Sequence, residues 1–228
     1  MTLGSIWESY VAFSTSVGYA ANKDPGKRTG GFDLSYKVPF VRNWLTIYAD
    51  SLTSDDPSPI DAPRRAALDA GLYMPRLPHL PKLDLRFESV YTDTPTGNFG
   101  YNNNPRQAGQ YVYWELFYHD LYTNKDNLIG NWVGRDGSGY QGWSTYWFNA
   151  RNSLQFGFRH AKVNGQFIPE GETVNDGSVS LNLQIRDDWS VSTGLQYERW
   201  LAPLLSPATQ TNWTTSVGIT YWPKSWSK

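Results

Sequence analysis

The chain has 228 residues, a formal net charge of −1 and no cysteine. This near-neutral charge argues against a nucleic-acid-binding protein, and the lack of cysteine excludes disulfides and thiolate metal sites. No run of about 18 apolar residues is present, which excludes a transmembrane helix.

The first ten residues, MTLGSIWESY, have neither the basic segment nor the apolar core of a signal peptide. We therefore expect either a mature chain or one that is incomplete at its N-terminus. Aromatic residues make up 16% of the chain, with 11 Trp and 15 Tyr. Tyr and Trp are enriched where a surface is apolar at one end and wet at the other, as at a membrane interface.

Apolar and polar residues alternate along most of the chain, which indicates β-strands. In residues 178–186, for example, Val179, Leu181 and Leu183 alternate with polar residues, and Asp187 and Asp188 form a tight turn to the next strand. We predict strands at residues 9–20, 30–39, 43–52, 66–74, 82–92, 110–118, 139–148, 152–163, 177–186, 189–199 and 211–222.

The predicted connections alternate between short and long, as in outer-membrane barrels with short periplasmic turns and long outer loops. The exception is residues 119–138. A further strand at 127–134 would restore the alternation, and it should pair with both 110–118 and 139–148. The prediction is then an all-β, antiparallel, up-and-down transmembrane barrel of about twelve strands with both ends on the periplasmic side.

The strand lengths favour this barrel over a soluble β-sandwich, which remains the alternative. Strands of roughly ten residues are longer than the usual five to six and suit a tilted membrane strand. We expect one continuous outer face that carries Leu154, Phe156, Phe158, Leu181, Leu183, Val217 and Ile219. We expect charges to line the lumen, with Arg159 and Glu198 in one upper polar layer and Asn182 and Gln196 below it.

Aromatic residues near the predicted strand ends suggest two interfacial girdles. One group lies by short turns or at the C-terminal strand end, and consists of Phe40, Trp44, Trp147, Phe148, Trp189 and Trp222. The other lies by long loops, and consists of Tyr19, Tyr91, Tyr111, Trp200 and Trp213. The alternative is that aromatic residues simply favour strands.

The segments LPKLDLRFESVYTDTP and YHDLYTNKDNLIGNWVGRDGSG, the second being the more specific, resemble Wzi-type capsule assembly proteins. The resemblance covers roughly residues 13 to 222. It implies an outer-membrane barrel, in contact with lipid, that binds capsular or other surface polysaccharide as a lectin and not as an enzyme. The resemblance also implies a larger family barrel of about eighteen strands, so residues 1–228 are expected to be a single barrel domain without the family's N-terminal part.

Residues that could support catalysis are few. His119 lies beside Asp120, and Ser144 or Ser153 could act as a nucleophile in an outer-membrane hydrolase. The predicted topology, however, places His119 and His79 in periplasmic turns and His160 on the outward row of its strand. The adjacent pair Asp55 and Asp56 suits a turn better than a protease or a calcium site. No catalytic residue, metal or cofactor is therefore predicted.

The loop TPTGNFGYNNNPRQ is the best candidate for sugar binding. Aromatic rings can stack on the CH-rich side of a pyranose, and amides can bind its hydroxyls. The predicted ligand-binding residues are Phe99, Tyr101, Asn102, Asn103, Asn104 and Arg106. Arg64 and Arg65 could also contact an acidic polysaccharide. The alternative for this loop is an ordinary Asn- and Gly-rich turn, and the alternative function on the same fold is a diffusion pore. The sequence does not indicate an oligomeric state.

Overall fold

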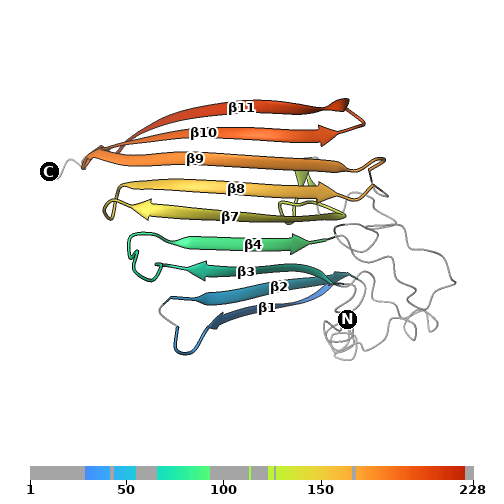
Figure 1. The fold of residues 1–228 in the computed structure, drawn as a ribbon, viewed down its shortest axis with the longest axis horizontal. Helices are drawn as coiled ribbons and strands as arrows, with labels where there is room; N and C mark the ends of the chain where they lie inside the picture. The colour runs from blue at the N-terminus through green and yellow to red at the C-terminus, as the bar shows by residue number, and fades with distance from the viewer. Residues whose placement is uncertain are drawn as a thin grey trace, which may run out of the picture.

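The computed structural model describes residues 29–41, 44–54, 66–92, 113, 123–125, 127–165 and 168–223. Nine of its strands form one antiparallel sheet, in the order β1-β2-β3-β4-β7-β8-β9-β10-β11 (Figure 1). Their bounds are β1 Thr29–Lys37, β2 Thr46–Ser54, β3 Ala67–Met74, β4 Leu85–Tyr91, β7 Gly137–Trp147, β8 Ser153–Val163, β9 Glu172–Arg186, β10 Trp189–Ala202 and β11 Ser206–Tyr221.

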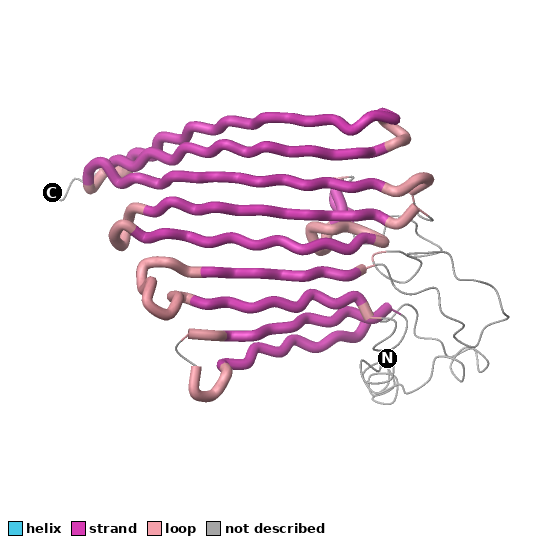
Figure 2. The backbone as a smooth tube through the Cα atoms, in the orientation of Figure 1, coloured by secondary structure: helices cyan, strands magenta, loops and turns pink. Residues whose placement is uncertain are grey.

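Strands make up most of the described chain (Figure 2). Besides the main sheet there is a small hairpin of β5 (Thr123–Asn124) and β6 (Asn127–Leu128). A search of the described residues finds no helix that is long and apolar enough to cross a membrane. The prediction of an all-β antiparallel fold is confirmed, and nine of the predicted strands correspond to strands of the main sheet.

The predicted strand at 127–134 is wrong. β4 pairs directly with β7, from Arg86 opposite Trp143 to Tyr91 opposite Ser138, so no strand lies between them. β7 is therefore the next strand of the main sheet after β4, and the described residues 127–136 lie outside this sheet. The predicted strands 9–20 and 110–118 lie outside the described residues, apart from Tyr113.

Two predicted long loops are shorter in the structure because the strands on either side extend into them. β10 and β11 pair as far as Ala202 and Ser206, which leaves a three-residue turn at 203–205 that is closed by a hydrogen bond from the Leu205 N–H to the Ala202 carbonyl at 2.8 Å. Similarly, β9 begins at Glu172. The polar residues of these segments suggested loops, but polar residues also suit one face of a strand.

The strand registers give the sheet one apolar face. Leu154 pairs with Leu181, which pairs with Thr193, and Thr193 pairs with Val217, so these side chains lie on the same side. Phe156 is 50% exposed, Ile219 65% and Val217 75%. In the described part of the chain no second sheet covers them, which confirms the predicted continuous face and contradicts a sandwich core.

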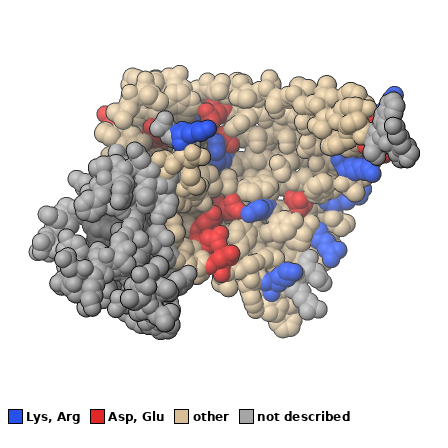
Figure 3. All heavy atoms as spheres, turned by 180° about the vertical axis from the view of Figure 1, so that it is seen from behind, with Lys and Arg blue, Asp and Glu red and all other residues tan. Residues whose placement is uncertain are grey.

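The opposite face, here called the polar face, carries most of the charged side chains of the strands. Figure 3 looks onto this face, where Asp and Glu side chains gather across the sheet with Lys and Arg beside them. The registers align six polar-face residues in one row across the strands, here called the central row. It consists of Tyr48, Glu88, Gln141, Arg159, Asp176 and Glu198.

The girdle prediction needs correction at two residues. Trp189 packs near Tyr221 at a ring distance of 4.7 Å, at one end of the β10–β11 pair, and Tyr197 packs near Trp213 at 4.8 Å, further along it. Trp147 and Trp200, however, pair with Ser153 and Val174 on the polar face. Because side chains alternate along a strand, neither can belong to a ring on the apolar face.

Candidate functional site

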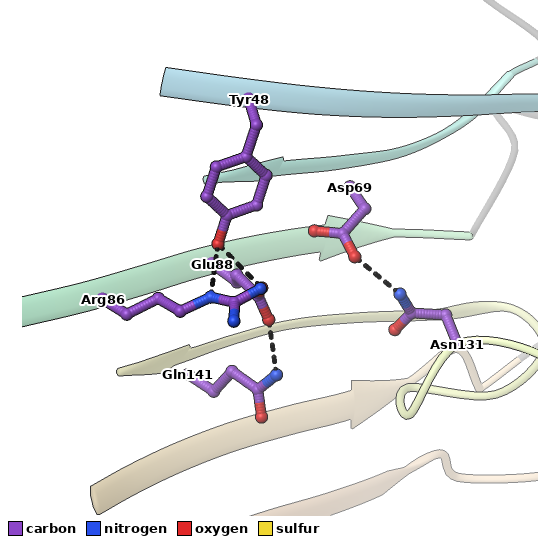
Figure 4. Close-up of polar contacts among 6 residues, drawn as sticks. All are labelled: Tyr48, Asp69, Arg86, Glu88, Asn131 and Gln141. Atoms are coloured by element: carbon purple, nitrogen blue, oxygen red, sulfur yellow. Dashed lines mark hydrogen bonds and ion pairs between the residues drawn. The ribbon is translucent and has the colours of Figure 1, made fainter. Parts of the chain in front are cut away.

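Glu88 is the centre of a hydrogen-bond network on the polar face (Figure 4). The Tyr48 hydroxyl and the Arg86 Nη2 each donate to Glu88 Oε1 at 2.7 Å, and the Gln141 Nε2 donates to Glu88 Oε2 at 2.7 Å. Arg86 Nε also donates to the Tyr48 hydroxyl oxygen at 2.9 Å. The network joins β2, β4 and β7, and it satisfies a carboxylate in a residue that is only 7% exposed.

Tyr48 reaches this network across the neighbouring strand. It lies on β2, whereas Arg86 and Glu88 lie on β4, and the intervening β3 has Gly71 at the same level. A Cβ at Gly71 would meet the Tyr48 hydroxyl oxygen at 2.5 Å, so only glycine leaves room for the tyrosine. The Arg86 guanidinium lies 5.4 Å from the Tyr48 ring centroid and 5.3 Å from that of Trp143, which adds cation–π attraction.

Further along the central row, Arg159 of β8 forms an ion pair with Asp176 of β9 at 2.6 Å. In the strand register, Asp176 lies opposite both Arg159 and Glu198 of β10. Arg159 and Glu198 therefore belong to one layer, as the sequence predicts. Asn182 and Gln196 lie nearer the Asp187–Asp188 turn, also as predicted. Asp176, the ion-pair partner of Arg159, is not among the predicted lumenal residues, because the predicted strand begins at residue 177.

The segment 127–136 folds against the polar face. The Asn131 Nδ2 donates to the Asp69 Oδ2 at 2.8 Å, which ties the segment to β3 (Figure 4). The Arg159 guanidinium lies 5.8 Å from the centroid of a Trp132 ring. The Arg135 Nη2 donates to the Tyr113 carbonyl at 2.7 Å; burial lowers the Arg135 pKa, and the Asp136 carboxylate opposes this effect. The segment therefore occupies space over β3, β7 and β8.

The two described histidines lie away from the polar face. His160 is on the apolar face, where its Nδ1 lies 2.7 Å from Asn175 Oδ1 and its ring packs near Tyr140. Ser144 is also on the apolar face, and its hydroxyl donates to the Asp84 carbonyl at 2.7 Å. His79 lies in the turn between β3 and β4. The described residues of the polar face thus offer hydrogen bonds, ion pairs and aromatic rings, the groups that bind a polar ligand.

The predicted sugar-binding residues cannot be placed on this framework. Phe99, Tyr101, Asn102, Asn103, Asn104 and Arg106 all lie outside the described residues, as do Arg64, Arg65, Asp55, Asp56 and His119. Sequence reasoning missed the polar-face groups Tyr48, Gln141 and Trp143, although each is the polar or aromatic member of an alternating pattern.

Loss of the Arg159 side chain should weaken the fold. Arg159→Met keeps the length of the side chain but leaves Asp176, whose side chain is 9% exposed, without its cation. We expect a loss of about 2 kcal/mol in the free energy of unfolding, measured by urea titration in detergent with tryptophan fluorescence. Asp187→Asn, which disrupts a pair with both side chains more than half exposed, should cost less than about 1 kcal/mol. If the two substitutions lower the free energy of unfolding equally, the Arg159–Asp176 ion pair is no more important for stability than an exposed pair.

Comparison with known proteins agrees with this architecture. The chain is similar in structure to Wzi, an outer membrane protein involved in group 1 capsule assembly in Escherichia coli and a carbohydrate-binding β-barrel. The TM-score is 0.63 at 18% sequence identity, and the match covers 88% of this chain and 43% of that one. The chain thus spans less than half the length of that protein, and at this identity the likeness shows the fold alone.

A search of curated proteins gives no match. A family model, in contrast, matches nearly the whole sequence: the model for the capsule assembly protein Wzi covers residues 1–215 of the 228. Together with the two-faced antiparallel sheet, this match shows that the chain belongs to the Wzi family of capsule assembly proteins.

Proposed function

We propose that this protein is part of a β-barrel in the bacterial outer membrane, where it holds capsular or another surface polysaccharide at the cell surface without transforming it. The sheet that has one uncovered apolar face and one hydrogen-bonded polar face is the observation that carries this proposal. Lipid would cover the apolar face, since an aqueous environment would leave Phe156, Val217 and Ile219 in contact with water.

A holding function fits the polar face better than a diffusion pore does. A pore needs an open lumen, whereas segment 127–136 lies against the polar face and is tied to it by Asn131 and Trp132. A hydrolase needs a histidine within reach of a nucleophile. His160 lies opposite Tyr140, four residues along β7 from Ser144, and Ser153 lies on the other face of the sheet. The chemistry of this face is that of binding, and the family's place in capsule assembly supports a polysaccharide as the proposed ligand.

We further propose that the loop at 94–107 makes the outermost contacts with the polysaccharide, through Phe99, Tyr101, Asn102, Asn103, Asn104 and Arg106. In the sequence, these residues follow β4, which ends at Tyr91. The combination of aromatic rings, amides and a guanidinium supports the proposal, because it provides stacking surfaces and donors for hydroxyl and carboxylate oxygens.

Substitutions in this loop test the proposed function. The double variant Tyr101→Ala with Arg106→Gln should release polysaccharide from the cell surface into the medium, with an apparent affinity roughly tenfold lower, equivalent to about 1.4 kcal/mol. Cell-bound and released polysaccharide are measured side by side, and heat-modified gel mobility verifies that the barrel still folds. Arg151→Gln, in the short turn at the other end of the sheet, is the control and should retain all polysaccharide. Full retention by the double variant would rule out the loop, and full retention by a deletion strain would rule out the function.

A further inference from the structure

The polar face contains a hollow of about 450 Å³ beside the central row, here called the Trp143 hollow. This volume is in the range of small-molecule sites, about 300–1,000 Å³. The hollow spans β7, β8, β9 and β10, and its polar and aromatic walls include Gln141, Trp143, Gln155, Arg159, Asp176 and Gln196.

The hollow exists because one row of the sheet lacks large side chains at its middle. Trp143 pairs with Gly157, Gly157 with Ser178, and Ser178 with Gln196. Gly157 has no side chain and Ser178 has a short one, so the floor lies lower than the central row. Trp143 and Gln196 stand at the two ends of this floor, about as far apart as three strand spacings of roughly 4.8 Å each.

The walls are held in place by interactions outside the hollow. Arg86 approaches the Trp143 ring from β4, on the opposite side of β7 from the floor. The Gln141 amide is fixed by its bond to Glu88, and the Gln155 Nε2 donates to the Thr145 hydroxyl at 3.2 Å. A site whose groups are already oriented loses less entropy when a ligand binds.

We propose that the Trp143 hollow binds one neutral pyranose unit of the polysaccharide, a deeper contact that rests on the proposed function and lies apart from the outer loop. The indole would stack on the CH-rich side of the sugar, as aromatic faces do in sugar sites. The amides of Gln155 and Gln196 and the Asp176 carboxylate would bind its hydroxyls, since amides both donate and accept and a carboxylate accepts.

The charges favour a neutral sugar over a uronic acid. Arg159 and Asp176 neutralise each other within the wall at 2.6 Å. On the β1–β3 part of the same face, Asp33 lies opposite Asp50, and Asp50 lies opposite Asp69, so three carboxylates lie side by side. A second anion at this face would meet repulsion with no free cation in the hollow walls, whereas hydroxyl groups carry no such penalty.

The test places a valine side chain in the hollow and compares its effect on sugar binding with that of the same substitution outside the hollow. In Gly157→Val the new Cβ meets the Ser178 Oγ at 2.7 Å, and in Gly194→Val it meets the Ser216 Oγ at 2.6 Å, so both polar-face variants face the same local crowding. Of these two glycines, Gly157 lines the hollow and Gly194 does not. Gln196→Ala is a second, milder variant, in case valine at 157 impairs folding.

The ligands are the surface polysaccharide of the bacterium that makes the protein and the neutral and acidic oligosaccharides released from it by partial hydrolysis. Titration calorimetry with the detergent-purified protein should show that Gly157→Val and Gln196→Ala weaken binding of the neutral fragments by roughly tenfold or more. Gly194→Val should bind them as the unmodified protein does.

Three outcomes would overturn the inference, and they separate it from the proposed function. If the protein binds the whole polysaccharide and both hollow variants bind it unchanged, the hollow is not the site and the proposed function stands. If only acidic fragments bind, the assignment to a neutral sugar is wrong. If the unmodified protein binds no polysaccharide, the proposed function fails, and the inference fails with it.

Discussion

Glu88→Ala should lower the free energy of unfolding by about 3 kcal/mol, because it removes the shared acceptor of three hydrogen bonds. The Tyr48 hydroxyl, the Arg86 guanidinium and the Gln141 amide would each lose their partner at 2.7 Å. We expect a smaller loss of free energy than for a fully buried ion pair, because the Arg86 side chain is 44% exposed and water can hydrate it. Chemical unfolding in detergent or lipid vesicles, monitored by tryptophan fluorescence, measures the change.

A double variant separates the lost charge pair from the lost packing. If Arg86 is left as an uncompensated cation in the Glu88 variant, then Arg86→Met combined with Glu88→Leu should recover part of the stability. A Glu88→Ala variant as stable as the unmodified protein would show that the network contributes nothing. The single variants Arg86→Met and Glu88→Leu are measured beside the double variant. If the double variant loses more free energy of unfolding than these two variants lose in total, the unpaired cation is not the source of the loss.

Leu181→Arg should cost about 2–4 kcal/mol, the price of a cation on the lipid side near the middle of a membrane strand. Leu181 lies on the apolar face between Leu154 and Thr193. Its neighbour Ser180 points to the polar face, between Gln155 and Gly194. Ser180→Arg is therefore the matched control, with the same charge one residue away, and should cost less than about 1 kcal/mol.

The comparison is made by unfolding from lipid vesicles and by the yield of protein in the outer membrane. The two variants introduce the same charge at adjacent positions of one strand, so their net charge is equal and the face of the sheet that receives the arginine differs. If Ser180→Arg is the more harmful of the two, the faces are assigned the wrong way round. If both are harmless, the apolar face does not meet lipid.

The alternation of side chains is what made the sheet predictable from sequence. Successive residues of a strand point to opposite faces, so the pattern around Leu181 and Leu183 determines both the strand and its apolar side. The same period placed His160 on the apolar face and Arg159 on the polar face, and both placements are confirmed. Length and composition excluded helical membrane spans and disulfides without any structure.

The alternation of side chains does not predict which strands pair across a long connection. The direct pairing of β4 with β7 depends on hydrogen bonds between residues such as Glu88 and Gln141, 53 positions apart in sequence. Local periodicity has no information on such partners, and the rule of alternating connections led to a false strand at 127–134. That segment lies instead on the polar face, through the contact of Asn131 with Asp69.

The candidate site also combines features that the sequence determines with features that only the tertiary structure decides. The sequence by itself determined which residues lie on the polar face, because alternation is a local property of the extended backbone. Only the tertiary structure decided which of them meet. The register brings Gly157 between Trp143 and Ser178, and Asp176 beside Arg159, and a shift of one residue would have turned these side chains to the opposite face.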